Sequence, residues 1–421
     1  MAATASALGQ PEATPAAPRR SGFDWRRTLY YALGGLVLFS LVRAITGTND
    51  ITSVGQVAAA ISVAVPILLA GLGGLWSERA GVINLGLEGM MIFGTWFGAW
   101  AGYQWGPWTG VVVGLLGGAL GALLHAIATV TFGVNHIVSG VAINILALGA
   151  TRFLSKLTFG AEEGGSATQS PQVDSLGSLT VPGLSDWLVS LNGKHWFLIS
   201  DLAGFLGALT TRLSWLSVIA VVLLVATYFI LWRSAFGLRL RSCGENPIAA
   251  ESLGVNVYLY KYVAVLISGA LAGLGGVFLS EVAAPFYREG QTVGLGYIGL
   301  AAMIFGNWRP VGVAMGALLF GFTGSLKERG AENVMAMFLL LGILLIVVAV
   351  WQVARKKYLQ SGLAALAGLG AVLTYLTVDA VPKQFIGAAP YIATLLVLAL
   401  AAQNLRMPKA NGKPYRKGQG K

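Results

Sequence analysis

The sequence predicts an all-α, polytopic membrane protein, and three observations carry this expectation. Hydrophobic residues make up 56% of the 421-residue chain and charged residues only 11%, whereas an ordinary soluble domain carries about 25% charged residues. Long apolar runs recur, and a bilayer core of roughly 30 Å requires about 20 apolar residues per helix. Because backbone groups in lipid must form hydrogen bonds within their own segment, these runs are expected to be helices.

The elements follow one another as apolar runs separated by polar connections. Residues 1–27 form a tail, rich in Ala, Pro and Thr at its start, that we expect to be disordered and cytoplasmic. Residues 28–405 are expected to form the transmembrane domain, with about 10–12 helices, and 406–421 a basic tail. The twelve candidate spans lie near 28–46, 51–75, 82–104, 107–131, 136–155, 213–232, 261–281, 291–307, 310–326, 334–354, 361–379 and 389–405.

The polar segments set the orientation. A long one, 156–212, is expected to be extracytoplasmic, and its 196–209 portion either spans the membrane or lies in the interface. With the N-terminus in the cytoplasm, nineteen of the 28 Lys and Arg residues fall inside. This bias agrees with the positive-inside rule and places both termini in the cytoplasm.

An internal repeat relates two parts of the chain. The hexapeptide LAGLGG occurs twice, each copy is soon followed by Ser-Glu, and the similar hexapeptides MIFGTW and MIFGNW come next. These elements lie at 69–74, 77–78 and 91–96 in the first copy and at 271–276, 280–281 and 303–308 in the second. The copies begin five crossings apart, so the halves have opposite orientations. Membrane transporters place the substrate route between such inverted halves, whereas a plain structural duplication is the alternative.

Polar residues near the start of the third span are candidates for a translocation path. Asn84 and Glu88 are four residues apart just inside an apolar run, a spacing that predicts one helix face. Charged groups at membrane depth are costly and normally face a cavity or a partner. The alternative is a structural cap at the cytoplasmic surface. Further polar candidates for the path are Asn135, Asn144 and Asn307.

The connection 234–260 is expected to be a cytoplasmic loop that presents a short helix to a partner. Asn246 suits the N-cap of that helix and Pro247 its first position. The helix should continue through Ala249 and Ala250 and end at Gly254. An ordinary capped connector is the alternative.

Several functions are excluded by what the sequence lacks. The net charge of +11 does not indicate nucleic-acid binding, because the basic residues lie between apolar runs and in the tails. The lone Cys243 has no internal disulfide partner. No G-x-x-x-x-G-K-[ST] phosphate loop occurs, and no metal cluster or nucleophile triad stands out. We therefore expect a chain that is not an enzyme and has no cofactor of its own, so that any ATP hydrolysis must come from another subunit.

Six stretches of the sequence resemble the permease family of ABC importers for branched-chain amino acids, ribose-like sugars and nucleosides. The resemblance is greatest to the nucleoside, guanosine-like branch and covers roughly residues 50–155, 213–328 and 388–417. The stretches are 77–91, CGENPIAAESLGVN at 243–256, YKY at 260–262, SGALAGLGG at 268–276, IGLAAMIFGNW at 298–308 and GKPY at 412–415.

The resemblance implies a function, partners and a location. It implies a permease subunit in the bacterial plasma (inner) membrane that imports a nucleoside by alternating access. It also implies a separate ATPase, a second permease, identical or homologous, and an extracytoplasmic substrate-binding lipoprotein. The coupling contact with the ATPase would be made by Gly244, Glu245, Asn246, Pro247, Ala249, Ala250 and Gly254.

The chain departs from the family pattern at its basic N-terminal tail and at 329–387, which is expected to insert two extra spans. Other readings stay open at this point. A ribose-like sugar or branched-chain amino acid importer is the alternative within the class. A secondary transporter driven by ions, with Glu88 as the coupling carboxylate, is the rival from another class. A membrane scaffold or channel is a third reading.

Overall fold

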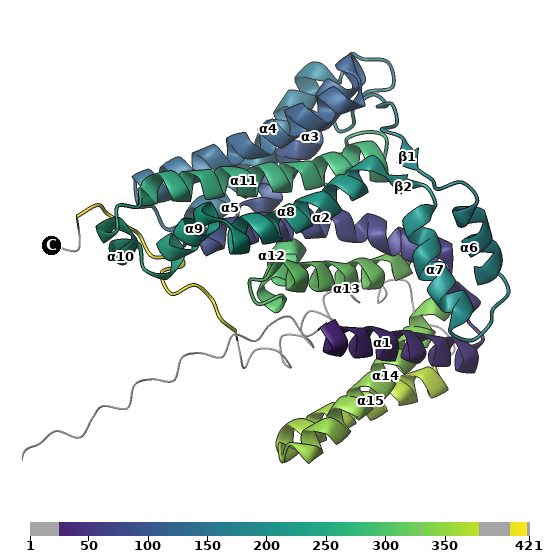
Figure 1. Cartoon of the computed structure of the whole chain (residues 1–421). Helices are drawn as coiled ribbons and strands as arrows, with labels where there is room; N and C mark the ends of the chain where they lie inside the picture. The colour runs from purple at the N-terminus through teal and green to yellow at the C-terminus, as the bar shows by residue number, and fades with distance from the viewer. Residues whose placement is uncertain (1–24, 330, 379–404, 419–421) are drawn as a thin grey trace, which may run out of the picture.

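The computed structural model describes residues 25–329, 331–378 and 405–418 (Figure 1). The described residues are overwhelmingly helical, and their only named strands form one two-stranded antiparallel pair. Seven of the described helices are long and apolar enough to cross a membrane, which confirms a polytopic helical membrane protein. The predicted span at 389–405 lies almost entirely outside the described residues, as does most of the tail at 1–27.

The described chain contains long helices and shorter elements. The long helices are α1 (Trp25–Thr46), α2 (Val54–Arg79), α3 (Leu87–Trp105), α4 (Pro107–Ala126), α5 (His136–Thr158), α8 (Trp215–Arg233), α11 (Val257–Phe278), α13 (Pro310–Arg329), α14 (Ala331–Ala354) and α15 (Tyr358–Thr377). The shorter elements are η1 (Asn49–Thr52), η2 (Ile127–Thr131), β1 (Ser178–Leu179), α6 (Leu184–Asn192), α7 (Ile199–Thr210), β2 (Leu213–Ser214), α9 (Ala235–Glu245), α10 (Pro247–Ser252), η3 (Leu279–Ala283) and α12 (Leu295–Phe305).

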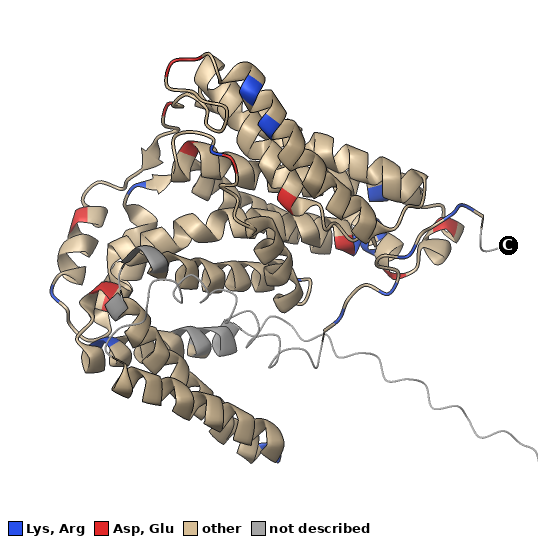
Figure 2. Cartoon of the chain, turned by 180° about the vertical axis from the view of Figure 1, so that it is seen from behind, with Lys and Arg blue, Asp and Glu red and all other residues tan. Residues whose placement is uncertain are grey.

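The bundle has two distinct ends (Figure 1). One end carries α9, α10 and the C-terminal segment, and we call it the α10 end. The other carries α6, α7 and the two strands, and we call it the β1 end. Charged residues gather at helix ends and in connections, and long stretches of the helices carry none (Figure 2). This distribution is the one expected of helices embedded in lipid.

The repeat found in the sequence is also present in the packing. Helices α2 and α11 lie side by side and antiparallel, because Gly73 meets the backbone of Ser268 and Gly275 meets that of Pro66. A shift of 202 residues turns one contact into the other, as a two-fold axis between the copies requires. Helices α3 and α4 of the first copy pack on α11, while α12 and α13 of the second pack on α2. The two copies are therefore interlocked and inverted.

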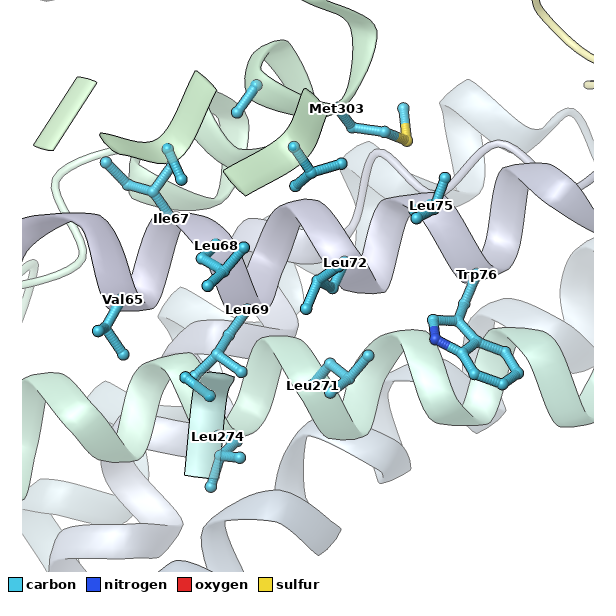
Figure 3. Close-up of a cluster of buried hydrophobic side chains, with 14 of the residues drawn as sticks. Val65, Ile67, Leu68, Leu69, Leu72, Leu75, Trp76, Leu271, Leu274 and Met303 are labelled. Carbon is cyan, nitrogen blue, oxygen red and sulfur yellow. The ribbon is translucent and has the colours of Figure 1, made fainter. Parts of the chain in front are cut away.

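The centre of the bundle is an apolar layer between these helices (Figure 3). Leu69 and Leu72 of α2 are fully buried there, and Leu271 and Leu274 of α11 and Met303 of α12 belong to the same cluster. Glycines bring the helix backbones close together around it, as at Gly94 and Gly273, where no room is left for a Cβ atom. Small residues at crossings are the usual way to pack helices in lipid, where burial of apolar groups between helices gives little driving force.

Two predicted spans differ from the observed helices. The span predicted at 82–104 begins as a helix only at Leu87, because residues 80–86 form a bend. The span predicted at 291–307 contains only α12, whose 11 residues extend about 16 Å at 1.5 Å per residue. Helix α12 thus covers about half of a hydrocarbon core of roughly 30 Å. It is a half-helix that starts in the interior of the bundle.

The polar segment between α5 and α8 forms a cap at the β1 end. Helix α7 has 12 residues, or about 18 Å, too few to span the bilayer. It is fixed by a buried cluster around Asp201, which pairs with Arg43 of α1 at 2.7 Å and accepts hydrogen bonds from Ser40 and Thr52. The segment 196–209 therefore forms a short helix of the cap, and its position in the membrane interface stays a prediction.

Helices α14 and α15 form a hairpin that projects from the main bundle (Figure 1). They correspond to the two extra spans expected at 329–387, and the basic residues Arg355, Lys356 and Lys357 form the turn between them. Of the two helices, α14 also packs against α1, α13 and η1, whereas α15 packs mainly against α14. The hairpin is therefore an appendage to the repeat rather than a part of it.

Candidate translocation and coupling site

A buried re-entrant segment, 80–86, joins α2 to α3. Helix α2 ends at Arg79, and the chain turns back at Gly81, whose φ of +84° favours glycine. The N–H of Val82 donates to the carbonyl of Ser77 at 3.1 Å, and the Ser77 hydroxyl donates to the Val82 carbonyl at 2.6 Å. Irregular backbone is tolerated at membrane depth only where protein covers it, and here α4, α5 and α11 provide the cover.

Side chains from two neighbouring helices satisfy the backbone of this segment. The N–H of Ile83 donates to His136 Nδ1 at 3.2 Å, and the Ile83 carbonyl lies 3.0 Å from His125 Nε2. The Leu85 carbonyl accepts from Asn144 Nδ2 at 3.0 Å. Both histidines are buried, which fits a structural role in holding the segment.

Asn84 and Asn144 connect the segment to both copies of the repeat. Asn84 donates to the Ser268 hydroxyl in the middle of α11 at 2.9 Å. Asn144 accepts from the N–H of Gly89 at 2.7 Å and donates to the Tyr297 hydroxyl at 2.8 Å. Asn84 lies before the start of α3, so the prediction that it shares a helix face with Glu88 is wrong. The positive φ at Gly81 and the bend that follows it are the reason.

Glu88 lies in the first turn of α3 and faces the start of the half-helix α12. Its carboxyl oxygens accept from the Thr292 hydroxyl at 2.6 Å and from the N–H groups of Gly294 and Gly296 at 2.9 and 2.7 Å. The first N–H groups of a helix have no partner within it and carry positive partial charge, so a carboxyl group stabilises them. Glu88 therefore joins the first copy to the N-terminus of a broken helix in the second.

The other two predicted path residues lie at helix ends. Asn135 caps α5, with its side-chain oxygen accepting from the N–H groups of Ile137 and Val138. Asn307 follows α12 with a φ of +52°, and its side-chain oxygen accepts from the N–H of Arg406 at 2.7 Å. The structure thus brings Asn84, Glu88 and Asn144 together and places Asn135 and Asn307 apart from them.

A second buried cluster, at the α10 end, was missed at the level of sequence. Glu78 Oε2 accepts from Trp308 Nε1 and from Asn411 Nδ2, each at 2.7 Å. We call these three residues the Glu78 joint. Glu78 ends α2 of the first copy, and Trp308 follows α12 of the second. The repeated Ser-Glu and MIFGNW motifs marked both positions, but no local pattern pointed to Asn411, which is 333 residues away from Glu78.

The short helix predicted after Asn246 is present as α10. Asn246 is its N-cap, accepting from the N–H of Ala249 at 3.1 Å, Pro247 is its first residue, and Gly254 follows it with a φ of +80°. Leu253 is 85% exposed and Ile248 41%, so α10 presents apolar side chains outward, as a docking surface would.

Of the remaining residues assigned to coupling, Glu245 and Ala249 are exposed, whereas Gly244 and Ala250 face the protein. Ala250 is buried, and Gly244 packs so closely on the backbone of Arg79 that a side chain would not fit. The Glu245 carboxyl accepts from the N–H of Lys409 at 3.4 Å. Burial raises the pKa of the neighbouring Cys243 thiol to about 11. This inner side of the connection is thus tied to α2 and to the C-terminal segment.

These features define a class of protein. Inverted repeats, a half-helix whose N-terminus lies in the interior, and a re-entrant segment at the interface between the copies are characteristic of membrane transporters. The family model for the branched-chain amino acid transport system permease component matches residues 56–349. The chain belongs to this family and is the permease subunit of an ABC importer. Its relatives are transporter permease subunits rather than enzymes.

The chain is similar to curated permeases over most of its length. It is 36% identical to the guanosine ABC transporter permease protein NupQ of Bacillus subtilis, over 86% of this chain and 97% of the relative. It is 33% identical to the nucleoside ABC transporter permease protein NupC of Lactococcus lactis, over 84% and 94%. It is 31% identical to the putative glucose ABC transporter permease protein TsgC13 of Haloferax volcanii, over 82% and 91%. No solved structure matches the chain.

Proposed function

We propose that this permease imports nucleosides. The observation that carries the proposal is its similarity to guanosine and nucleoside permeases across nearly the whole of their length and its own. ABC permeases work with an ATPase and a substrate-binding protein, and the absence of a phosphate loop from the sequence fits that arrangement. We further propose that the substrate-binding protein is an extracytoplasmic lipoprotein and that the membrane is the bacterial plasma membrane.

The α10 end is proposed to face the cytoplasm. Arg79, Arg241 and Lys261 lie at this end, together with the basic residues of the C-terminal segment. Lys and Arg are concentrated in the cytoplasmic connections of membrane proteins. Both termini would then be cytoplasmic, and the cap formed by α6 and α7 would face the extracytoplasmic substrate-binding protein.

Helix α10 is proposed to dock on the ATPase. Its outward side exposes Ile248 and Leu253, whereas Ala250 anchors its inner side. Asn246 and Pro247 fix the start of the helix, so the docking surface is preorganised. ATP and Mg²⁺ would be bound by the ATPase and not by this chain.

Asn84, Glu88 and Asn144 are proposed to hold the two copies together beside the translocation path. Each connects the first copy or α5 with α11 or α12 of the second. A movement of one copy against the other must rearrange these contacts, which is how alternating access proceeds in transporters with inverted repeats. Asn135 and Asn307 would act only by fixing the helix ends near the path. A second permease subunit, identical or homologous, would complete the path.

Transport by purified components tests the proposal. The complex of this chain with its ATPase, partner permease and binding protein is placed in proteoliposomes, and uptake of labelled guanosine and ribose is measured with and without internal ATP. We expect ATP-dependent guanosine uptake that falls at least about tenfold in Asn246→Ala, a loss of roughly 1.4 kcal/mol of coupling. Uptake by this chain alone, driven by an ion gradient and indifferent to ATP, would contradict the proposal.

Asn256→Ala is the matched control for this experiment. Asn256 caps α11 as Asn246 caps α10, accepting from the N–H of Leu259 at 3.2 Å. Each substitution removes one N-cap, at a cost of about 1 kcal/mol in stability. Only Asn246→Ala should lower uptake, because only that cap belongs to the docking helix.

A sugar is the second candidate substrate. The observation in its favour is the 31% identity to the putative glucose permease, again over most of both chains. The labelled ribose in the same assay decides between the two. A branched-chain amino acid remains the family's third substrate class, and leucine uptake is measured alongside. An ion-coupled role for Glu88 is less well supported, because its carboxyl group already accepts three hydrogen bonds.

A further inference from the structure

The C-terminal segment 405–418, which we call the strap, has no helix or strand and still contacts several distant elements. It begins beside Asn307, runs past the end of α2 and the end of α9, and finishes near α10. Ala410, Asn411 and Tyr415 are buried. An irregular segment pays a large conformational entropy cost to be ordered in this way, so its contacts must offset that cost.

One part of the strap completes the Glu78 joint. Asn411 is 7% exposed and donates to the same Glu78 oxygen that accepts from Trp308. Two flanking backbone bonds fix Asn411 in place. The N–H of Ala410 donates to the Gly244 carbonyl at 2.9 Å, and the N–H of Gly412 to the Gly81 carbonyl at 3.3 Å. The strap therefore contacts α2, the turn after α12 and the end of α9 within three residues.

Another part of the strap holds α10. The Tyr415 ring packs in an apolar cluster with Cys243, Ala250 and Val257, and its centroid lies 5.4 Å from that of Tyr258. Further along the strap, the N–H of Gly418 donates to the Glu251 carboxyl of α10 at 3.5 Å. Helix α10 itself packs mainly on α9 and on the start of α11. Its connection to α2 and to the turn after α12 thus runs through the strap or through α9.

We propose that the strap transmits movement of α10 to the two copies of the repeat, with Tyr415 and Asn411 as positioning residues at its two points of attachment. This inference rests on the proposed docking of α10 on the ATPase. When the ATPase moves α10, Tyr415 moves with it and displaces the strap. The displaced strap carries Asn411, which is hydrogen-bonded to Glu78, so the contact between Glu78 and Trp308 changes as well. The strap is suited to this task because it bonds to both copies at the place where they meet. The competing route is the direct packing of Gly244 on Arg79.

The test measures guanosine uptake and ATP hydrolysis on the same proteoliposomes holding the full complex. Asn411→Ala removes a hydrogen bond to a carboxyl group and Tyr415→Ala removes a packed ring, and each should lower the uptake per ATP hydrolysed at least about tenfold. Co-purification of the ATPase and its hydrolysis rate should be retained. Tyr415→Phe, which keeps the packed ring, should restore most of the ratio. Lys417→Ala, an exposed change in the same strap, is the matched control and should leave the ratio unchanged.

The lone cysteine gives a second readout that does not depend on the transported solute. Cys243 is buried in the same cluster as Tyr415. A thiol reacts with maleimide as the thiolate, and burial raises the pKa of Cys243, so its labelling in the wild-type complex should be slow. If Tyr415→Ala opens the strap, the pKa of the Cys243 thiol should fall from about 11 toward its ordinary value of 9.0, so labelling near neutral pH should become faster. In the wild-type complex, labelling should change when an ATP analogue is added.

The outcomes separate the two proposals. An unchanged uptake-to-hydrolysis ratio in both alanine variants would overturn the strap proposal and assign transmission to α9. Loss of the ATPase from the Tyr415→Ala complex would also overturn it, because the strap would then be a docking surface. If the wild-type complex takes up no nucleoside but labelling of Cys243 still responds to the ATP analogue, the substrate proposal fails and the strap proposal stands.

Discussion

The two copies of the repeat carry the same Ser-Glu pair at opposite ends of the bundle, and its surroundings differ completely. Glu78 ends α2 at the α10 end, and Glu281 lies in the π turn η3 at the end of α11, near the β1 end. Both side chains are 4% exposed. Glu78 accepts from Trp308 and Asn411. Neither oxygen of Glu281 has a hydrogen-bond partner among the described residues, and glycines of α3 and α4 pack against it.

The difference shows that duplication fixes the position of a residue but not its role. A buried polar group contributes to stability when it is paired and costs about 1–3 kcal/mol when it is not. The carboxyl group at the α10 end therefore has two donors to one of its oxygens, whereas the carboxyl group at the β1 end has no donor among the described residues. The partners of Glu78 come from the second copy and from the strap, and neither has an equivalent around Glu281 in the part of the chain that the structure describes.

The largest effect is expected from removing each carboxyl group in turn. Glu78→Ala leaves the buried N–H donors of Trp308 and Asn411 unpaired, so we expect a loss of about 2–6 kcal/mol of unfolding free energy. Glu281→Ala leaves no donor of the described residues unpaired and should cost much less. Thermal unfolding of the two variants in lipid nanodiscs measures this. Equal losses in the two variants would show that the two sites do not differ as described.

A smaller effect is expected from the matched tryptophans of the two hexapeptides. Trp308→Phe removes a donor to a carboxyl group, at a cost of about 1.5–3 kcal/mol. Trp96→Phe removes a neutral bond of 3.0 Å to the Ser155 hydroxyl, at a cost of about 1 kcal/mol. Both rings are buried to the same degree, so the loss of packing is similar and the difference isolates the Glu78 joint. A larger loss of unfolding free energy in Trp96→Phe than in Trp308→Phe would contradict this comparison.

The two-fold relation between the two copies can be tested more closely at a pair of equivalent glycines. A Cβ on Gly73 would lie 2.5 Å from the Ser268 carbonyl oxygen, whereas a Cβ on Gly275 would lie 3.1 Å from that of Pro66. Overpacking of a tight helix crossing costs about 1–3 kcal/mol. Gly73→Ala should therefore lower the unfolding temperature more than Gly275→Ala does. The reverse order would contradict the packing of α2 on α11.

The smallest effect is expected from Glu281→Gln. The amide has nearly the same shape and removes only the capacity to ionise, so the unfolding free energy should rise or stay within about 1 kcal/mol of wild type. The measurement is again thermal unfolding. A loss of several kcal/mol would mean that Glu281 has a partner that the described residues do not include.

Much of this architecture could be predicted because the determinants are local. Apolar runs predicted most of the helices. Asn246 and Pro247 predicted the start of α10, because capping depends on adjacent residues. The start of α3 was predicted at residue 82 instead of Leu87, because the glycines of this stretch indicate that the helix can break there but do not show that Gly81 adopts a positive φ. The short length of α12 was missed because the predicted span at 291–307 included the flanking residues 291–294 and 306–307, which lie outside the helix.

The candidate site was predicted less completely because its contacts are distant in sequence. Glu88 was identified from its charge at membrane depth, but its partners at the start of α12 are more than 200 residues away. Glu78 was noticed only as part of a repeat. Asn411 carries no local signal at all, because an asparagine in a polar tail is ordinary unless the tail is known to fold back.

The measurement that tests the central claim most directly is guanosine uptake per ATP hydrolysed by complexes carrying Glu78→Ala or Gln56→Ala. Gln56 is buried in the same helix near the β1 end, where it donates to Ser325 at 2.8 Å. If the Glu78 joint connects the ATPase to the repeat, Glu78→Ala will lose most uptake per ATP and Gln56→Ala will keep most of it. Equal ratios in the two variants would show that Glu78 only stabilises the fold, and would contradict the account.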